Sequence, residues 1–310
     1  MPFTEVTLND GRKIPAIGFG TWKVPNDVTA GEVDQAIDIG FDHIDTAQIY
    51  GNETEVGQAI KESGLSRKDI WVTTKWSGVD NKSPRQSILE SLEKLGLEYL
   101  DLYLIHHPRL TKGDIRGTWK EFEGLKKEGF VKSIGVSNFT KEDLQELLTH
   151  ATIKPVVNQI LLHPYVISTQ GPLLSYLSQQ NIIPEGYSSL IPLTSKPGGP
   201  VDKPVGEIAE RLGKKPEQVL LAWSKAKGHV LPLLFIFPAV IVTTSSKKER
   251  LESYLDVGDI TLSPDDVHAI DKAGIKGQLW DERKERLVKA SKWAVPVYIG
   301  FWVLFKAFSA

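Results

Sequence analysis

Segments rich in β-branched and aromatic residues recur about every thirty residues along the first half of the chain and continue beyond it. They lie at 41–45, 70–75, 101–106, 131–137, 155–160 and 181–185. About thirty residues accommodate one strand, one helix and two short loops, so the spacing predicts consecutive parallel strands joined by crossover helices. The strands are mostly apolar without strict alternation, as in YLDLYLIH, which is typical of strands enclosed on both faces. The pattern therefore predicts an enclosed parallel sheet.

Such a sheet either closes into a barrel or stays open and doubly wound, and the glycine motifs distinguish the two. No G-x-G-x-x-G follows the 41–45 strand, and no G-x-x-x-x-G-K-S/T loop or G-x-S-x-G elbow occurs. Gly18-Phe19-Gly20 lacks the third glycine. The chain has 310 residues without a Pro/Gly-rich linker between its repeats, which suits one large barrel domain. An α/β (β/α)8 TIM barrel is favoured.

Helix signals fill the gaps between the predicted strands. Ser83 is a predicted N-cap, Pro84 suits the first helical position, and Gln86 completes a capping box. Similar starts occur at Thr140 and at Ser263. Ahead of the repeats, residues 4–20 resemble a hairpin that turns at Asn9-Asp10-Gly11 and lies outside the repeating pattern.

Composition excludes several classes of protein. The net charge is -2 without a long run of one sign, which disfavours a nucleic-acid binder. Because the chain has no cysteine, disulfides, thiolate zinc sites, iron-sulfur clusters and cysteine nucleophiles are excluded. The first twenty residues contain no secretory h-region. These features favour a cytoplasmic protein.

Polar side chains stand at the ends of the predicted strands, where barrels of this kind carry their active sites. They are Asp45, Lys75, His106, Ser137, Asn138, Gln159 and Tyr187. Tyr50 follows Asp45 closely, and a nearby lysine cation lowers the pKa of a phenol. The set predicts a pocket with a proton-donating tyrosine.

Several motifs, taken in order and spacing, resemble the aldo-keto reductases over roughly residues 4–280. They are GFGTW at 18–22, DTAQIYGNE at 45–53, VTTKW around Lys75, LDLYLIHHP at 100–108, GVSNF at 135–139, VVNQILLHPY at 156–165 and GYSSL at 186–190. The resemblance implies an eightfold barrel whose opening hairpin closes its bottom. It also implies reduction of aldehydes or ketones, reversible in principle, with NADPH or, in fewer members, NADH.

The resemblance also implies roles for individual residues. Tyr50 is the expected proton donor, Lys75 and Asp45 tune it, and His106 orients the carbonyl group of a small-molecule substrate. The expected substrate pocket consists of Trp22, Trp76, His106 and His107. The expected cofactor contacts are Thr21, Trp22, Asp45, Ser137, Asn138, Gln159, Tyr187, Ser188, Leu190, Thr244, Ser245, Lys247 and Arg250.

Each residue alone has a structural alternative, such as a loop cap for Asp45 or a core histidine at position 106, and only the set favours catalysis. For Trp22 and Trp76, pocket wall and ordinary core are equally good interpretations. A metal-dependent hydrolase is disfavoured because the strand ends supply few clustered histidines and carboxylates, so no metal site is expected. A non-catalytic nucleotide-binding barrel that serves as a partner subunit is the alternative function.

The chain departs from the family pattern where the adenosine end of the cofactor is expected, near the seventh strand. The family pattern I-P-K-S-x-x-P-x-R-I-x-E-N becomes IVTTSSKKERLESY, so Thr244 replaces the lysine while Ser245 and Arg250 remain. Lys247, Lys248 and Arg250 still suit a 2′-phosphate, which favours NADPH.

Two apolar stretches do not fit one barrel. Residues 230–243 contain more apolar residues than one strand needs, and two prolines interrupt them. Residues 293–310 form an apolar tail after a predicted single domain at 1–292. A pocket wall is the preferred role for this tail, with membrane contact or a dimer contact as the alternatives. The natural substrate, the physiological direction, and monomer versus homodimer are not readable from the sequence.

Overall fold

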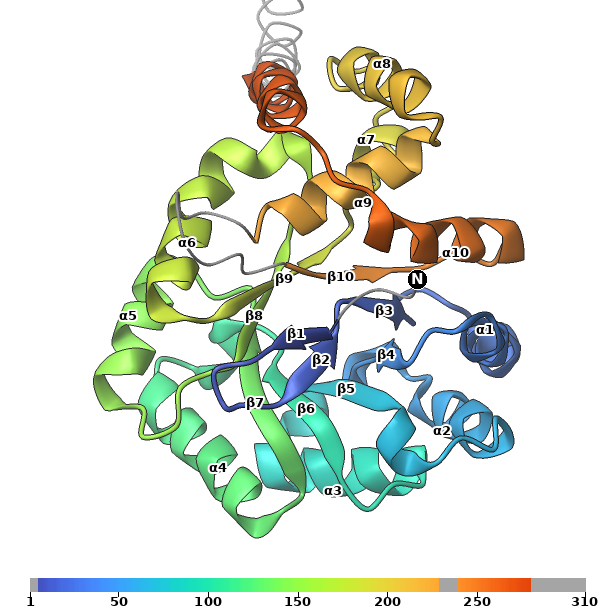
Figure 1. The fold of residues 1–310 in the computed structure, drawn as a ribbon. Helices are drawn as coiled ribbons and strands as arrows, with labels where there is room; N and C mark the ends of the chain where they lie inside the picture. Colours follow the sequence, from blue (N-terminus) through green and yellow to red (C-terminus); the bar gives the residue numbers. More distant parts are fainter. Residues whose placement is uncertain (1–4, 229–238, 280–310) are drawn as a thin grey trace, which may run out of the picture.

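The computed structural model describes residues 5–228 and 239–279, and within them eight parallel strands form a closed barrel. Helices surround this barrel as an outer ring (Figure 1). The closing pair joins β3 to β10, with Gly18 opposite Val242. The barrel strands are β3 (Ile17–Gly20), β4 (His43–Asp45), β5 (Trp71–Trp76), β6 (Leu100–Ile105), β7 (Val131–Ser137), β8 (Val157–Leu161), β9 (Ile183–Tyr187) and β10 (Val240–Thr243). The predicted TIM barrel is confirmed.

The N-terminal hairpin is shorter than the sequence predicts. It consists of β1 (Glu5–Thr7) and β2 (Lys13–Pro15), which pair antiparallel around a turn that includes Gly11 at φ +85°. Residues Ile17–Gly20, assigned above to the hairpin, form the first strand of the barrel wall instead. The strand that ends near the adenosine motif is consequently the eighth strand of the barrel, not the seventh.

Helices alternate with the barrel strands, and their starts follow the predicted caps. Ser83 and Gln86 form the expected capping box, and Thr140 forms another with Asp143. Ser263 and Asp266 bond reciprocally at the start of the helical residues 264–279. The other α-helices are α1 (Asn26–Ile39), α2 (Glu53–Glu62), α3 (Pro84–Leu95), α4 (Ile115–Glu128), α5 (Lys141–His150), α6 (Ile167–Gln180), α7 (Ile191–Thr194), α8 (Asp202–Leu212), α9 (Pro216–Ala226) and α10 (Lys248–Leu255).

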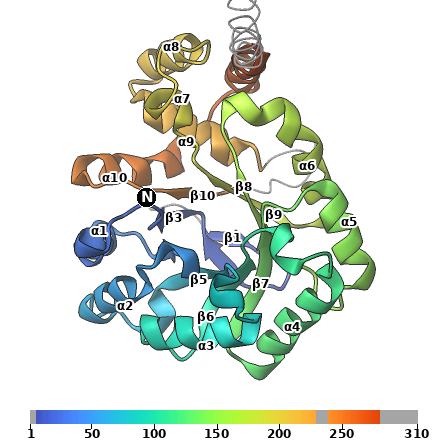
Figure 2. The ribbon, with the colours of Figure 1, turned by 180° about the vertical axis from the view of Figure 1, so that it is seen from behind.

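Two apolar cores hold the barrel together. The larger one lies between the strands and the helices and includes Trp119 and Phe122, whose rings stack with centroids 6.0 Å apart. The smaller one fills the barrel bottom, where Val6 and Ile14 of the hairpin pack with Trp71 and other strand residues. The hairpin thus closes one end of the barrel (Figure 1), and the carboxyl ends of the strands open at the other (Figure 2).

Part of the predicted organisation lies outside the described residues. Of the apolar stretch 230–243, only the last five residues are described, and four of them form β10. The tail at 293–310 lies wholly outside, so the division into a 1–292 domain and a tail stays a prediction. Among the described helices, none combines the length and the apolar character that crossing a bilayer requires.

Candidate active site

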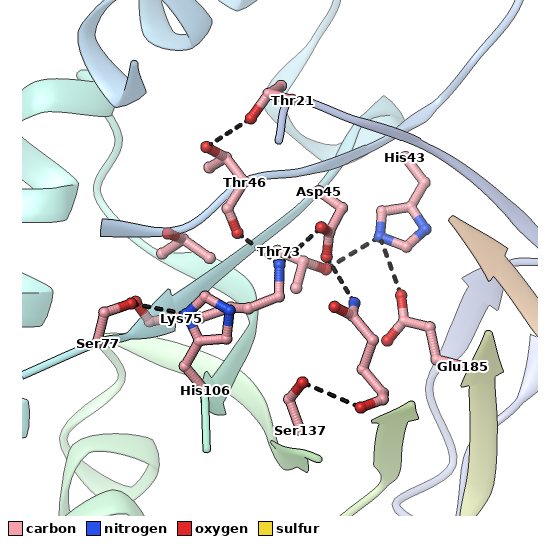
Figure 3. A network of polar contacts seen from close by, with 12 residues as sticks. Thr21, His43, Asp45, Thr46, Thr73, Lys75, Ser77, His106, Ser137 and Glu185 are labelled. Atoms are coloured by element: carbon pink, nitrogen blue, oxygen red, sulfur yellow. Dashed lines mark hydrogen bonds and ion pairs between the residues drawn. The ribbon is translucent and has the colours of Figure 1, made fainter. Parts of the chain in front are cut away.

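The strand ends bring the predicted catalytic side chains together at the open end of the barrel. Asp45 is the last residue of β4, Lys75 is the last but one of β5, and His106 directly follows β6. These strands are neighbours in the barrel, so their carboxyl ends meet. Figure 3 shows the three side chains pointing toward one another.

Lys75 is fully buried, and hydrogen bonds hold its ammonium group. Its Nζ atom lies 2.6 Å from Oδ1 of Asp45 and 2.8 Å from the carbonyl oxygen of Thr46. The other carboxylate oxygen of Asp45 accepts a 2.8 Å bond from Nε2 of Gln159. The ammonium and carboxylate therefore have fixed positions before any ligand arrives.

Tyr50 lies beside this pair on a short 3-10 turn, Gln48–Tyr50, that follows β4. The Lys75 Nζ atom is 5.2 Å from the centroid of the Tyr50 ring, and the ring of His106 meets that ring edge-on at 5.7 Å. Tyr50 itself is only partly buried. Its ring is thus in reach of both the buried cation and the open end of the barrel.

The pKa directions correct one expectation. Burial raises the pKa of Tyr50 above 10.0; the Lys75 ammonium opposes this rise, and the Asp45 carboxylate adds to it. The lysine acts in the predicted direction, but the net shift is upward because desolvation outweighs it. Burial alone would lower the pKa of Lys75, yet Asp45 and Tyr50 turn the net shift upward. Both groups therefore keep their protons at neutral pH.

His106 is held as a neutral imidazole. Burial lowers its pKa to about 3, and the Lys75 charge acts in the same direction. Its Nδ1 atom lies 2.8 Å from the hydroxyl of Ser77, and the Asn138 amide donates to its backbone carbonyl at 3.0 Å. If the Ser77 hydroxyl donates to Nδ1, the proton sits on Nε2, and that nitrogen is a hydrogen-bond donor.

The residues expected to hold a carboxamide lie next along the barrel wall. Ser137 ends β7 and donates to the backbone carbonyl of Gln159 at 3.0 Å. The hydroxyl of Tyr187, at the end of β9, donates to Oδ1 of Asn138 at 2.8 Å. The Asn138 amide donates to the hydroxyl of Ser137 at 3.0 Å, so the side chains of Ser137, Asn138 and Tyr187 form one connected set. Asn138 adopts φ +60° there.

The loop after β3 carries Thr21 and Trp22. Thr21 is buried and bonds to the hydroxyl of Thr46 at 2.9 Å. Trp22 is 52% exposed, with the Lys23 ammonium 4.3 Å from its ring centroid. Of the two interpretations of Trp22, this exposure at the carboxyl end of a strand favours the pocket wall over the core.

Trp76 and His107 differ in placement. Trp76 is 7% exposed, its indole donates to the carbonyl of Lys82, and its ring meets Phe122 of α4 edge-on at 6.4 Å. These contacts belong to the layer between the strands and the helices, so they favour the core interpretation of Trp76. His107 is partly exposed and accepts a hydrogen bond from the backbone of Arg109 at 3.3 Å.

The segment expected to hold the adenosine end of the cofactor follows β10 and leads into α10. Thr244, Lys247 and Arg250 are exposed, and Ser245 is partly buried. The hydroxyl of Ser245 accepts from the backbone of Lys247 at 3.1 Å, and among the described residues no side chain caps the start of α10. Of the remaining predicted contacts, Ser188 and Leu190 follow β9 ahead of α7.

Sequence reasoning missed several residues that support the site. Ser77 contacts His106 as described, and Gln48 accepts from the backbone of Ser77 at 3.2 Å. Asn52 donates to the carbonyls of Thr21 and Val24 and so fastens the loop after β3. Ser77 follows Lys75 by two residues, and this same-face spacing is the signal that points to it.

One buried group also needs a chemical interpretation. His43, Asp45 and Glu185 each offer an atom within 4.8 Å of the others, as metal ligands do. The Lys75 ammonium already contacts Asp45, however, and a second cation beside it would be repelled. We therefore assign no metal to this group.

Comparison with known proteins agrees with this architecture. A model of the aldo/keto reductase family matches residues 16–275. Methylglyoxal reductase DkgA of Escherichia coli K12 is 35% identical over 270 residues, which span 87% of this chain and 93% of that protein.

Solved structures agree as well. A Brucella melitensis aldo/keto reductase matches with a TM-score of 0.76 and 39% identity, over 87% of this chain and 99% of its own. A Bombyx mori aldo-keto reductase in complex with NADP matches with a TM-score of 0.78 and 31% identity, over 88% and 93%.

Proposed function

The chain belongs to the aldo-keto reductase family, whose members are oxidoreductases of carbonyl compounds, and we propose that it reduces an aldehyde or ketone to the alcohol with NADPH. The observation that carries the proposal is the arrangement of Tyr50 beside the buried Lys75–Asp45 pair, with His106 on its other side. A barrel that only bound nucleotide would not need this arrangement.

The residues present fit a nicotinamide dinucleotide. The connected side chains of Ser137 and Asn138, together with the neighbouring Gln159, supply donors and acceptors for a carboxamide, and Tyr187 supplies an aromatic face next to them. At the other end, no described side chain caps the start of α10, so the backbone N–H groups of Lys248 and Glu249 remain for phosphate oxygens, while those of Lys247 and Arg250 are already bonded. Lys247 and Arg250 make no ion pair with another described residue, which leaves their charges for a 2′-phosphate.

When bound, this cofactor would supply the hydride, and the side chains of the chain would handle the proton. Tyr50 keeps its proton at neutral pH and gives it to the carbonyl oxygen as negative charge develops there. The Lys75 ammonium then stabilises the phenolate that remains. Asp45 holds this ammonium in place, so the cation cannot move away from the ring.

His106 orients the substrate in this proposal. Its pKa of about 3 means that the ring is neutral throughout the working pH range. With Ser77 donating to Nδ1, the Nε2–H group points a hydrogen bond at the carbonyl oxygen and polarises it. The exposed Trp22 supplies an apolar wall beside the entrance.

The test follows NADPH absorbance with a panel of aldehydes, ketones, aldoses and dicarbonyls, using the wild type and Tyr50→Phe. We expect at least one class to be reduced, and we expect Tyr50→Phe to lower kcat by about 10²- to 10⁴-fold because the proton donor is gone. NADPH binding, followed by fluorescence, should stay within about twofold of wild type. Turnover near wild type in the variant, or nucleotide binding without any carbonyl reduction, would contradict the proposal.

A further inference from the structure

A second tier of polar side chains lies inside the barrel, directly beneath the catalytic residues. Each of its members precedes a mouth residue by two positions on the same strand, and alternate residues of a strand face the same side. Asp45, Lys75 and Tyr187 are those mouth residues. The lower tier, as we name it, consists of His43, Thr73 and Glu185. All three side chains are 0% exposed, and Figure 3 shows them next to the Asp45–Lys75 pair.

We propose that Glu185 is a positioning residue of the reaction: it stays uncharged while the enzyme works, and its ionisation weakens Tyr50 as a proton donor. This inference rests on the proposed function. It concerns a residue that the family resemblance does not implicate, a buried acid whose carboxyl oxygens make no hydrogen bond of normal geometry within the described residues.

The contacts of His43 determine its protonation state. Its Nε2 atom lies 3.0 Å from the hydroxyl of Thr73, and that hydroxyl already accepts a 3.1 Å bond from the Trp71 indole. The hydroxyl therefore has its own hydrogen to give to Nε2. Burial lowers the pKa of His43 to about 4, so the imidazole is neutral. With the Thr73 hydroxyl donating to Nε2, the single ring proton lies on Nδ1, and Nε2 has none to give to Glu185. Residue 18 is a glycine, and a Cβ there would come 2.8 Å from the His43 ring, so the absence of a side chain at this position leaves room for the ring.

The surroundings of Glu185 favour the protonated form of its carboxyl group. Neither carboxyl oxygen has a hydrogen-bond partner of normal geometry in the described part of the chain. The side-chain amide of Gln159 lies near enough to favour the carboxylate, but it already donates to Asp45 at 2.8 Å, and the nearest approach to His43 Nε2 is 3.9 Å. An ionised carboxylate without a well-placed donor is strongly disfavoured in a dry interior, so the carboxyl group of Glu185 keeps its proton. Burial raises the pKa of Glu185 to about 8, and the Asp45 charge acts in the same direction, while Lys75 and Gln159 oppose the rise.

The charge of Glu185 affects the pKa of Tyr50. A charge on Glu185 raises the pKa of Tyr50, as the Asp45 charge does, whereas the Lys75 ammonium lowers it. While Glu185 is neutral, one carboxylate offsets the ammonium. When Glu185 ionises, two carboxylates do so, and the phenol holds its proton more tightly.

The groups that face Glu185 account for this coupling. The titratable ones come from β4 and β5, and the amide of Gln159 comes from β8. From β10, the residue paired with Glu185 is Val240, which carries no charge. The charged and titratable groups are His43, Asp45 and Lys75. Lys75 is the only cation among them. A negative charge on Glu185 therefore opposes the lowering of the Tyr50 pKa by the Lys75 ammonium.

The experiment measures kcat for carbonyl reduction at saturating NADPH from about pH 6 to about pH 10 in wild type, Glu185→Gln and Thr73→Val. Because the donor weakens as Glu185 ionises, the wild-type kcat should fall near pH 8, the pKa given above for this carboxyl. Glu185→Gln keeps the shape of the neutral acid, so its kcat should lie within about threefold of wild type below pH 7 and show no fall near pH 8. Thr73→Val is the matched control: it disturbs the same tier but leaves the carboxyl in place, so the fall should remain.

A second readout does not depend on activity. The infrared difference spectrum between wild type and Glu185→Gln at pH 7 should contain the band of a protonated carboxyl, and this band should disappear as the pH passes about 8. If Glu185→Gln fails to fold, the wild-type infrared titration still tests the protonation of Glu185.

Different results would contradict the coupling to Tyr50, the neutral state of Glu185 and the proposed function. A Gln variant whose kcat still falls near pH 8, or a uniform loss of kcat at every pH, would overturn the coupling. An ionised Glu185 at pH 7, or a stoichiometric metal ion in the purified protein, would overturn the neutral state. If no carbonyl compound is reduced, the proposed function fails, while the infrared band still decides whether Glu185 is protonated.

Discussion

The two ends of the proposed cofactor site hold their side chains in opposite ways. At the barrel mouth, the Lys75 ammonium is fully buried and bonded to Asp45 and to the Thr46 carbonyl. In the segment after β10, Lys247 and Arg250 are exposed and make no ion pair with the other described residues. The chemical end of the proposed site is therefore organised by the fold, whereas the phosphate end is left for the ligand to organise.

This difference follows from what each end must do. Proton transfer requires a fixed geometry, because a cation that is free to move loses its hold on a developing phenolate. Recognition of a phosphate requires only that charges and donors be available when it arrives, and solvated cations meet that need. Substitutions in the two regions should therefore affect different measured quantities.

The largest effect is expected for Lys75→Met. Removal of the ammonium should lower kcat by about 10²- to 10⁴-fold, because the phenolate left after proton transfer loses its counter-charge. It should also destabilise the fold by about 3–5 kcal/mol, since Asp45 keeps a buried charge without its partner. Steady-state kinetics and chemical denaturation measure the two effects. NADPH affinity near wild type is expected as the control. A kcat within tenfold of wild type would contradict the role of the Lys75 ammonium in the chemical step.

The sequence predicts most of this buried end because its signals are repetitive. The strand spacing and the caps at Ser83 and Thr140 identify the barrel, and the strand ends then bring Asp45 and Lys75 together. Where the sequence misleads, the cause is local. Only Ala16 separates β2 from β3, so no turn signal marks the end of the hairpin.

Burial is the property that the sequence does not show. Apolar residues occupy both faces of these strands, so the hydrophobic pattern does not mark the inner side. The two-residue spacing from Asp45 and Tyr187 gives the side of His43 and Glu185, but not how completely they are buried. The net upward shift in the pKa of Tyr50 has the same origin, since it depends on how much water the folded chain removes. For the exposed end, the sequence shows the motif departure at Thr244, but its effect on binding depends on contacts that the ligand makes.

An intermediate effect is expected for Arg250→Ala. If the guanidinium binds a 2′-phosphate, its loss removes a charge-assisted contact of about 1.5–3 kcal/mol, or about 10- to 100-fold in the NADPH dissociation constant. Affinity for NADH should change by less than about twofold, and kcat with saturating NADPH should be nearly unchanged. Equal losses for both cofactors would show that Arg250 does not bind the 2′-phosphate. A lower kcat would show that Arg250 also affects the chemical end of the site.

The smallest effect is expected for Thr244→Lys, which restores the cation of the family pattern at an exposed position. Because exposed charges are solvated and screened, the gain in NADPH affinity should be only about threefold at low salt, with little change for NADH. Titrations at low salt and at about 1 M salt separate this gain from a change in shape, since screening should abolish it. Thr244→Met, similar in length but uncharged, is the matched control and should show no gain. A large gain that persists at high salt would mean that this segment encloses the phosphate in a dry pocket, and the exposed end would then be organised by the fold as the buried end is.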